Sequence, residues 1–587
     1  MTGAIRPEPR WVDPEPVSEA DVAALHGALG LPLLVCRILV RRGYADEESV
    51  RSYLRPHLES LPPPRLLPDM MAAVGRIERA LETGETILVH GDFDVDGMAG
   101  AALLARGLRA LGGEVEAFVP DRLLDGYDLG PAGLRRAREV RADLIVTVDC
   151  GMTAVEAVEE ATRDGFDVIV TDHHRPGVRQ PPALAVVNPQ RADSEYPFDG
   201  LSGVGVAFKL LAALYTHVGR PSADLNPHLD LVALGTIADR APLIGENRVL
   251  VKAGLRVLAH TRNAGLRALM AIARLQPLGG RVSEEDAAFQ LAPRLNAAGR
   301  MGAAKEGLLL LVTEDPSEAE ALARRLDSLN RQRRLTDQRV LAEAEAQLDE
   351  PRHAEGHAAV VLSSDAWHPG VIGIVASRLA ERLGRPAVLI AFDDDRGRGS
   401  ARSAGGVNLI RALDECAPLL ERYGGHRQAA GFDVRRENLA EFSARFVQTV
   451  AQMKEERSAD DAASEGGEAG DGGDIVIDLS LTIREAAEAM PRWMRYLEPF
   501  GDANPRPVFR AGNVELAGVS RVGDDGGHLR AVVVGEEGGR LDAIGFGMGG
   551  RADDMGKGRW EVAFELVEDT WRNRNRVQAR LLDARPA

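Results

Sequence analysis

The sequence predicts an α/β protein in which two α/β lobes, the first built on a parallel sheet, are joined by a long helix and followed by a C-terminal all-β barrel. Three patterns predict this architecture: strand-like runs that alternate with helical segments, a long charged stretch without Gly or Pro, and a tail of short alternating strands. At 587 residues the chain is long enough for about four folding units.

The first lobe is predicted between residues 86 and 187. Its β-rich runs lie at 86–89, 115–119, 144–148, 168–170 and 183–187. Helical segments such as 98–111 and 154–164 separate these runs. Alternating strands and helices predict a parallel sheet, because each helix carries the chain back to the start of the next strand.

A continuous helix is predicted over residues 318–348, which are charged and rich in Leu and Ala. A second α/β lobe follows, with strands near Ala359 and Ala387. The tail then has five alternating apolar runs, at 514–519, 528–534, 541–546, 560–567 and 577–582. Five short strands favour a small barrel such as an OB-fold, which typically binds single-stranded nucleic acid or sugar. The loop at Trp571 carries three Arg and is equally compatible with a solvated turn and with a nucleic-acid contact.

Residues 455–474 have the composition of a flexible linker, rich in Ser, Ala, Gly and acidic residues and without an aromatic ring. They carry eight carboxylates and one Arg, so they account for −7 of the net charge of −18. The overall charge therefore does not exclude a nucleic-acid partner, because much of it lies in one short segment.

Composition excludes several classes of protein. Apolar residues make up 45% of the chain and charged residues 27%, values that exclude a fibrous or wholly disordered protein. No run approaches the roughly 20 apolar residues of a membrane helix, and the N-terminus lacks a signal pattern. We therefore expect a soluble, cytoplasmic protein without a membrane partner. Three Cys are too few for a disulfide framework or a closed thiolate zinc site, so any metal needs oxygen and nitrogen ligands.

A cluster of carboxylates is predicted at the carboxyl ends of the parallel strands. Asp92, Asp94 and Asp96 alternate directly after the first strand, where open α/β sheets bind their ligands. Three neighbouring carboxylates repel one another unless a cation is present, which favours a metal site over a capped, solvated turn. Asp149 ends a later strand in the same way.

The next strand ends in Asp172-His173-His174, and two adjacent His beside a strand-end Asp favour metal binding over a core role. Asp and His ligands without a thiolate suit Mn²⁺ or Mg²⁺. Asp239 ends an apolar helical run and is a weaker candidate, because capping the next segment would also explain it.

The second lobe contains three glycine-containing segments that we interpret as phosphate-binding loops. The first, 367–373, enters a helix, whose N-terminus presents free N–H groups. The others, 399–403 and 424–426, add hydroxyls, a guanidinium and an imidazole.

Together these motifs resemble the DHH phosphoesterases, and within them the bacterial single-strand exonucleases. The resemblance covers about residues 20–587. It rests on His90-Gly-Asp-Phe-Asp-Val-Asp-Gly97, Val148-Asp-Cys-Gly151, Asp172-His-His174, Leu234-Gly-Thr-Ile-Ala-Asp239, Pro293-Arg-Leu-Asn-Ala-Ala-Gly-Arg-Met301, Trp367-His-Pro-Gly-Val-Ile-Gly373, Ser400-Ala-Arg-Ser403, Gly424-Gly-His426 and Glu498-Pro-Phe-Gly-Asp-Ala-Asn-Pro505.

The resemblance implies a metal-dependent exonuclease that hydrolyses single-stranded DNA in the 5′-to-3′ direction, in recombination and repair. It implies two Mn²⁺ or Mg²⁺ ions held by Asp94, Asp96, Asp149, His173 and Asp239. Asp92 would lie close by, and His174 beside the scissile phosphate, so that Asp92, Asp149 and His174 form the catalytic set. His90 resembles a metal-binding His of related pyrophosphatases. The implied DNA contacts are Arg122, Tyr127, Ser400 and Arg402 at the 5′-phosphate, Arg300 and His368 along the backbone, and His426.

The implied domains are an N-terminal extension and helical segment (1–75), the DHH catalytic domain (76–317), the connecting helix (318–349), the DHH-associated domain (350–454), the acidic linker (455–474) and an OB-fold that binds single strands (475–587). A monomer is implied, with a single-strand-binding protein and a helicase as partners. Two alternatives remain: a phosphodiesterase for small nucleotides, which would usually be shorter, and a DNA-holding scaffold, which would lack metal carboxylates.

Overall fold

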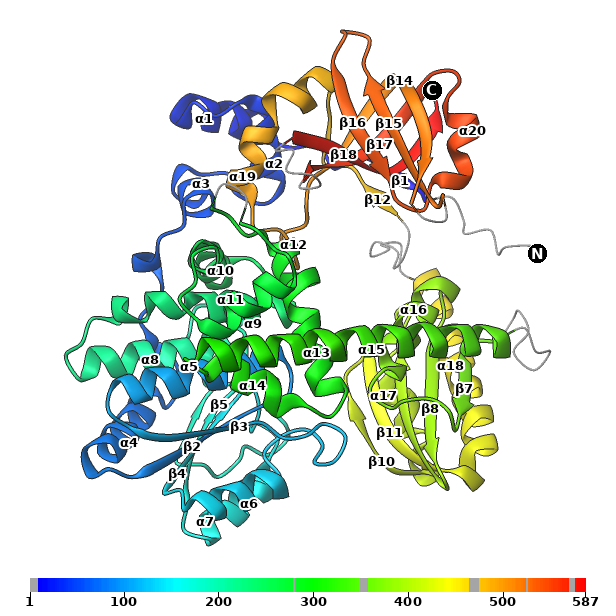
Figure 1. Ribbon diagram of the computed structural model, residues 1–587. Coiled ribbons are helices and arrows are strands. Elements are labelled where there is room, and N and C mark those ends of the chain that lie inside the picture. Colours follow the sequence, from blue (N-terminus) through cyan, green and yellow to red (C-terminus); the bar gives the residue numbers. More distant parts are fainter. Residues whose placement is uncertain (1–8, 278–279, 349–356, 464–473, 524–525, 570–575) are drawn as a thin grey trace. The chain divides into compact units, whose positions relative to one another are not determined.

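The computed structural model describes residues 9–277, 280–348, 357–463, 474–523, 526–569 and 576–587 (Figure 1). The chain forms two compact units. The larger unit combines residues 9–299, 303–326 and 475–587, and the smaller one contains residues 300–302 and 327–474. Residues 570–575, which include Trp571, lie outside the described residues, as do residues 464–473 of the predicted linker.

A five-stranded parallel sheet forms the centre of the first lobe, as the sequence predicts. The strand order is β3-β2-β4-β5-β6, with β2 at Thr86–Gly91, β3 at Glu114–Phe118, β4 at Leu144–Val148, β5 at Asp167–Thr171 and β6 at Ala185–Val187. Every residue of β4 is buried, which explains its run of Val and Ile. Because the strands are parallel and in register, the carboxyl ends of β2, β4 and β5 meet at one edge of the sheet.

Helices cover both faces of this sheet (Figure 1). The helices of this part of the chain are α4 Met70–Thr83, α5 Val95–Ala110, α6 Pro131–Val140, α7 Val155–Arg163, α8 Gly203–His217, α9 Leu229–Ala238, α10 Gly245–Leu258, α11 Ala264–Ile272, α12 Glu284–Asp286, α13 Ala292–Arg300 and α14 Ala304–Val312. Helices α6 and α7 share a hydrophobic core with one face of the sheet. Helix α5 approaches the other face closely, because a Cβ on its Gly100 would lie only 2.4 Å from Cγ1 of Val148.

The predicted long helix is present as α15, Pro316–Leu348. It leads into the second lobe, a sheet of order β10-β11-β9-β8-β7. The elements of this lobe are β7 Val360–Ser364, α16 Ile372–Leu383, β8 Ala387–Asp393, β9 Arg396–Arg402, α17 Leu409–Asp414, β10 Leu420–Gly425, β11 Ala429–Arg435 and α18 Leu439–Ala463. Helix α18 therefore continues into the segment predicted as a linker.

The structure corrects two predicted loops in this lobe. Residues 399–402 lie within β9, and Gly424 and Gly425 end β10. The glycines of β9 lowered its predicted strand propensity, but they make room for aromatic rings of the core. A Cβ on Gly399 would lie 2.2 Å from the ring of Phe432.

The C-terminal barrel is also present, which confirms the predicted fold class. Its strands are β13 Leu479–Ser480, β14 Val508–Val522, β15 His528–Val534, β16 Arg540–Gly545, β17 Trp560–Asp569 and β18 Arg576–Pro586, and the pairing of β14 with β17 closes the ring. Helix α20 spans Ala552–Met555. The first and last parts of the chain also meet, because β1 (Trp11–Val12) pairs in parallel with β12 (Ile475–Val476).

The N-terminal helices pack against the C-terminal barrel, which the sequence did not predict. These helices are α1 Glu19–Leu29, α2 Leu33–Arg41 and α3 Glu47–Leu54. Val22 and Ile38 lie in the same hydrophobic core as Phe509 and Phe564 of the barrel, together with α19, Pro491–Leu497. The two ends of the chain therefore fold as one body.

Arg248 of α10 links the first lobe to this body. Its buried guanidinium donates hydrogen bonds to the backbone oxygens of Tyr53, Tyr496 and Glu498 at 2.9–3.0 Å, and it lies 3.8 Å from the centre of the Tyr53 ring. Among the described residues, no helix combines the length and the apolar composition that crossing a membrane requires.

Candidate metal centre

Three aspartates lie where the chain leaves β2 and enters α5. Asp94 caps α5, because its Oδ1 accepts hydrogen bonds from two backbone N–H groups of the first turn at 2.9 and 3.2 Å. Asp96 is fully buried and accepts two more from the start of α8, at 2.7 and 2.9 Å. Asp92 is buried as well, and its Oδ1 has no hydrogen-bond partner among the described residues. Backbone donors thus fix Asp94 and Asp96, while Oδ1 of Asp92 remains available to a ligand.

Asp149 follows β4 with a φ of 61°, in the left-handed region that residues other than Gly rarely adopt. Such strain is typical of functional sites, where the surrounding structure holds it in place. Gly203, the first residue of α8, packs directly against the Asp149 side chain. A Cβ on Gly203 would lie 2.5 Å from the Asp149 Cβ and 2.8 Å from its Oδ1. Only glycine fits this position without displacing the carboxylate.

His173 faces the carboxylates across the sheet edge. Its Nε2 lies 3.1 Å from Oδ1 of Asp149, 3.8 Å from Oδ2 of Asp239 and 4.0 Å from Oδ2 of Asp96. Neither this Nε2 nor Oδ1 of Asp149 makes a hydrogen bond to a described residue, although both atoms are buried. Buried polar atoms without partners are rare and point to a missing ligand.

Asp239 immediately follows α9, and the next helix begins only at Gly245 after Ile244. The alternative that Asp239 caps the following helix therefore does not apply. Its carboxylate instead approaches His173, which brings the weakest of the predicted ligands into the cluster.

His174 is oriented by Asp172. Its Nδ1 lies 2.8 Å from Oδ1 of Asp172 and 3.3 Å from the hydroxyl of Tyr127. Burial disfavours protonation of His174, but the hydrogen bond and charge of Asp172 outweigh it and raise the pKa of His174 to about 9. His174 is therefore a cation at neutral pH when no metal is bound, which suits contact with a phosphate.

The carboxylates repel one another strongly. Burial, followed by the charges of neighbouring carboxylates, raises the pKa of Asp96 and of Asp149 well above the ordinary value. Burial and then Asp94 act in the same way on the pKa of Asp92. Divalent cations would remove this repulsion and leave all three groups ionised.

The side chains form three overlapping groups whose ligand atoms lie within 4.8 Å of one another. These groups are Asp149 with His173 and His174, Asp96 with His173 and Asp239, and Asp92 with Asp94 and Asp149. Because Asp149 and His173 each belong to two groups, the arrangement can hold more than one ion. Oxygen and imidazole donors without thiolate fit Mn²⁺ or Mg²⁺.

His90 lies apart from these groups. It is fully buried at the end of β2, and burial lowers its pKa to about 4. Its Nδ1 is 3.7 Å from Sγ of Cys150, and its Nε2 faces α6, where a Cβ on Gly133 would lie 2.7 Å away. His90 as a ligand stays a prediction.

Two of the predicted DNA-binding residues lie beside the cluster in the larger unit. Arg122 stacks over the ring of Phe93 at 5.1 Å, and the rings of Phe93 and Tyr127 meet edge to face at 6.4 Å. Tyr127 is 47% exposed and contacts His174 edge to face at 6.0 Å. A cation, the partly buried ring of Phe93 and the exposed ring of Tyr127 thus flank the carboxylates.

The other predicted DNA-binding residues lie in the smaller unit. Ser400 and Arg402 are joined by a 2.9 Å hydrogen bond and lie against Gly373 in the first turn of α16, where a Cβ would be 3.0 Å from the hydroxyl of Ser400. Arg300 and His368 both contact Gly370, through a 3.5 Å bond to its carbonyl and a 3.0 Å bond from its N–H.

His426 is exposed in the hairpin between β10 and β11. The register of β11 and β9 places this hairpin at the same end of the sheet as Arg402.

Several residues of the centre escaped sequence analysis. Asp128 accepts hydrogen bonds from the Gly151 N–H and the Thr153 hydroxyl at 2.6 and 2.7 Å, and so fixes the loop after Asp149. Gln190 donates to the His173 carbonyl at 2.6 Å. Gly203 could have been found from the sequence, because residues 202–205 are a glycine-containing segment, Ser-Gly-Val-Gly, at the start of an apolar helix. Asp128 and Gln190 carry no comparable local signal.

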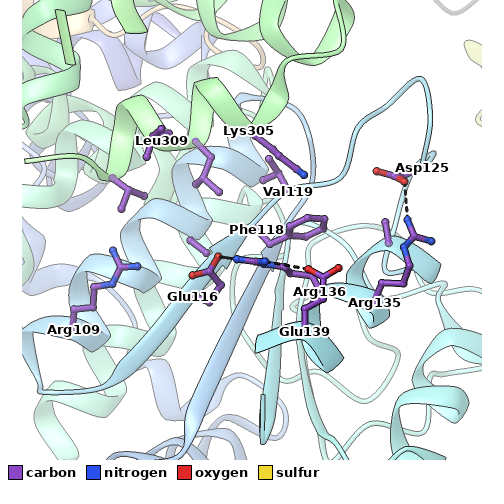
Figure 2. Close-up of a pocket in the computed structure, with 14 residues that line it drawn as sticks. Arg109, Glu116, Phe118, Val119, Asp125, Arg135, Arg136, Glu139, Lys305 and Leu309 are labelled. Carbon is purple, nitrogen blue, oxygen red and sulfur yellow. Dashed lines mark hydrogen bonds and ion pairs between the residues drawn. The ribbon is translucent and has the colours of Figure 1, made fainter. Parts of the chain in front are cut away.

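A pocket of about 480 Å³ beside the edge strand β3 contains none of these residues. Figure 2 shows that its carboxylates are paired with two of its Arg side chains. Arg136 bonds Glu116 and Glu139, and Arg135 bonds Asp125. Because each of its carboxylates is bound to an Arg, the pocket does not compete with the carboxylate cluster as a metal site.

Comparisons with known proteins agree with this geometry. Three family models match the chain: the DHH family N-terminal domain at residues 86–236, the DHHA1 domain at 356–452 and the RecJ OB domain at 477–583. With the aspartate and histidine cluster at the sheet edge, these matches define a DHH phosphoesterase.

Relatives with curated names specify the family further. The single-stranded-DNA-specific exonuclease RecJ of Bacillus subtilis is 35% identical over 98% of this chain and 70% of its own length. The protein of the same name from Dickeya dadantii is 35% identical over 93% of this chain and 95% of its own length. The crystal structure of RecJ with Mn²⁺ from Thermus thermophilus superposes with a TM-score of 0.80 and 32% identity, over 98% of this chain and 80% of that one. The chain belongs to the RecJ family.

Proposed function

We propose that this chain is a metal-dependent exonuclease that hydrolyses phosphodiester bonds of single-stranded DNA from the 5′ end. The observation that carries the proposal is the set of buried, unpartnered ligand atoms on Asp92, Asp149 and His173, which face one another at the carboxyl edge of the sheet. The substrate class comes from the family, whose named members are single-stranded-DNA-specific exonucleases.

Asp94, Asp96, Asp149, His173 and Asp239 would hold two Mn²⁺ or Mg²⁺ ions, and the oxygens of Asp92 lie within reach of the same place. When bound, two divalent ions polarise a phosphodiester and supply a water that is acidic near neutral pH. The donor set fits these ions, and related structures from Thermus thermophilus were solved with Mn²⁺ and with Mg²⁺.

The chain's own residues supply orientation and charge. His174 is held by the hydrogen bond to Asp172, so its ring would donate a hydrogen bond to a phosphate oxygen beside the bond that breaks. The exposed ring of Tyr127, adjacent to His174, would stack on a nucleobase. These contacts select a nucleotide chain in the orientation that presents its phosphate to the carboxylates.

Recognition of a chain end would explain why cleavage starts at a terminus. By the family resemblance, the terminal 5′-phosphate would be bound by Arg122 of the larger unit and by Ser400 and Arg402 of the smaller unit, which lie in β9 against the first turn of α16. Arg300, His368 and His426 would contact the backbone. The polar groups around Gly370 and Gly373 are compact and glycine-lined, as close approach to phosphate requires.

The direct test uses single-stranded oligonucleotides labelled at the 5′ or the 3′ end, with Mn²⁺ and with a matched RNA strand. Short products from the 5′ label, weak cleavage of RNA and loss of cleavage in an Asp149→Ala variant are expected. Because Asp149 lies in a loop after β4, the variant should keep the wild-type circular dichroism and melting temperature. Preferred cleavage of dinucleotides would favour the small-nucleotide phosphodiesterase, and tight binding without cleavage would favour the scaffold.

The working context is proposed from the family resemblance. The protein would act in the cytoplasm as a monomer, in recombination and repair, on strands exposed by a helicase and covered by a single-strand-binding protein. Sedimentation of the purified chain tests whether it is a monomer. Co-purification with a helicase or a single-strand-binding protein tests the proposed partners.

A further inference from the structure

A second cavity, of about 710 Å³, lies within the larger unit and contains none of the metal-centre residues. Its walls come from the end of α3 and the segment after it, from α10, from residues 281–284 at the start of α12, and from α19 with the residues that follow it. It therefore lies where the first lobe meets the body formed by the N-terminal helices and the barrel.

The wall is strongly cationic. Among the described residues, six Arg or Lys side chains line the cavity, against two carboxylates. Arg281 pairs with Glu498 at 2.6 Å, and Arg495 pairs with Glu568 outside the cavity at 2.9 Å. Three guanidinium groups, those of Arg55, Arg256 and Arg492, have no carboxylate partner among the described residues.

Lys252 adds a fourth cation whose position is fixed. Its ammonium donates to the backbone oxygens of Leu54 and Tyr496 at 3.1 and 2.9 Å. Burial, followed by the charges of Arg248 and Arg256, lowers the pKa of Lys252 to about 7. The wall thus concentrates positive charge beyond what its own carboxylates compensate, and an incoming anion would relieve that repulsion.

An aromatic ring lies among these cations. The ring of Tyr496 is 6.0 Å from the guanidinium carbon of Arg55 and 5.5 Å from the ring of Trp493. Arg492 in turn stacks over Trp493 at 5.0 Å. Guanidinium groups next to aromatic faces are the combination that recognises phosphate and nucleobase together.

We propose that this cavity is a second phosphate-binding site, separate from the metal centre, which takes the phosphates of a nucleotide or of a nucleic-acid strand. Arg55, Arg256 and Arg492 would contact the phosphates, and Tyr496 would contact the base. The volume is of the size that a mononucleotide occupies in proteins.

The test compares an Arg256→Gln/Arg492→Gln variant with an Arg163→Gln/Arg267→Gln control in the full-length protein. The control removes the same charge from exposed positions elsewhere in the larger unit. Inorganic tripolyphosphate is titrated calorimetrically without divalent metal. We expect affinity to fall by about tenfold or more in the cavity variant, since each charge-assisted contact is worth over 1 kcal/mol, and to stay at the wild-type value in the control.

A second arm identifies the source of the phosphates. The salt dependence of binding is measured for a single DNA strand of about 30 nucleotides. If the strand occupies the cavity, loss of two phosphate contacts should make the negative slope of log K against log salt shallower by about 1.4. A slope equal to that of the control, with tripolyphosphate binding lost, identifies a free nucleotide as the ligand. Equal behaviour of cavity and control variants in both arms overturns the proposal. Cleavage of a dinucleotide with Mn²⁺ should be unchanged in both variants, so a failure here is distinct from a failure of the metal centre.

Discussion

Replacing Gly203 by Ala should disable the metal centre without touching a ligand. The added Cβ would lie 2.5, 2.8 and 2.9 Å from three atoms of the Asp149 side chain, whereas ordinary carbon contacts begin near 3.4 Å. Something must therefore move by about 1 Å, a displacement that can cost about 100-fold in rate when it misplaces reacting groups. Asp149 has little freedom to yield, because its backbone already lies in the left-handed region. Movement of α8 instead would withdraw the N–H groups that hold Asp96.

The matched control is Gly205→Ala, two residues farther along the same helix. There the new Cβ meets its nearest atom, the hydroxyl of Ser202, at 3.2 Å, which requires a shift of only a few tenths of an ångström. Both changes alter helix propensity alike, so their difference isolates the contact with Asp149. Cleavage of a 5′-labelled strand is measured across a Mn²⁺ titration. We expect about 100-fold slower cleavage in the Gly203 variant, and a higher Mn²⁺ concentration at half-maximal rate. Rates within a few-fold of the control at every Mn²⁺ concentration would refute the reasoning.

Three further predictions concern charge and packing. Burial and then Glu498 raise the pKa of Glu284 to about 7, so the protonated form is favoured in the folded state. Glu284 should therefore lower the free energy of unfolding by about 3 kcal/mol as pH rises from about 4.5 to 7, and urea titrations should show that Glu284→Gln lacks this part of the pH dependence of wild type. Arg248→Met removes the donor to the backbone oxygens of Tyr53 and Glu498, while that of Tyr496 keeps the Lys252 ammonium, and should destabilise the protein by about 3 kcal/mol, whereas a change below about 1 kcal/mol would contradict the assigned role. Because burial and then the charges of neighbouring carboxylates raise the pKa of Asp96 and Asp149, Mn²⁺ binding should release protons, which calorimetry in buffers of different ionisation enthalpy detects.

The sequence predicts the elements of this protein well where a strand or helix carries its own pattern. Residues 144–148 and 528–534 are strands with the predicted bounds, because both runs are dense in β-branched residues and end at turn residues. The long helix begins two residues before the predicted start and ends where expected. In each case the local pattern and the tertiary environment agree.

Prediction failed where the deciding contact is distant in sequence. Strand β9 contains two glycines and was interpreted as a loop, yet the rings of Phe392 and Phe432 occupy the space that side chains would fill. The N-terminal helices gave no sign that their apolar faces belong to a barrel more than 400 residues away in the chain. Local propensity cannot reveal such pairings, because the partner is specified by the fold as a whole.

In the metal centre, too, sequence motifs predict some features, whereas others depend on contacts that are distant in sequence. That its candidate ligands converge could be predicted, because parallel topology brings the ends of β2, β4 and β5 to one edge. What the motifs do not contain is the means of holding mutually repelling carboxylates in place. The structure supplies it with the N–H groups of α5 and α8 and with a glycine that lets α8 begin against Asp149. Because these supports are backbone groups, the centre keeps its shape through interactions that no ligand motif records, and we therefore expect the loss of Gly203 to impair it as the loss of Asp149 would.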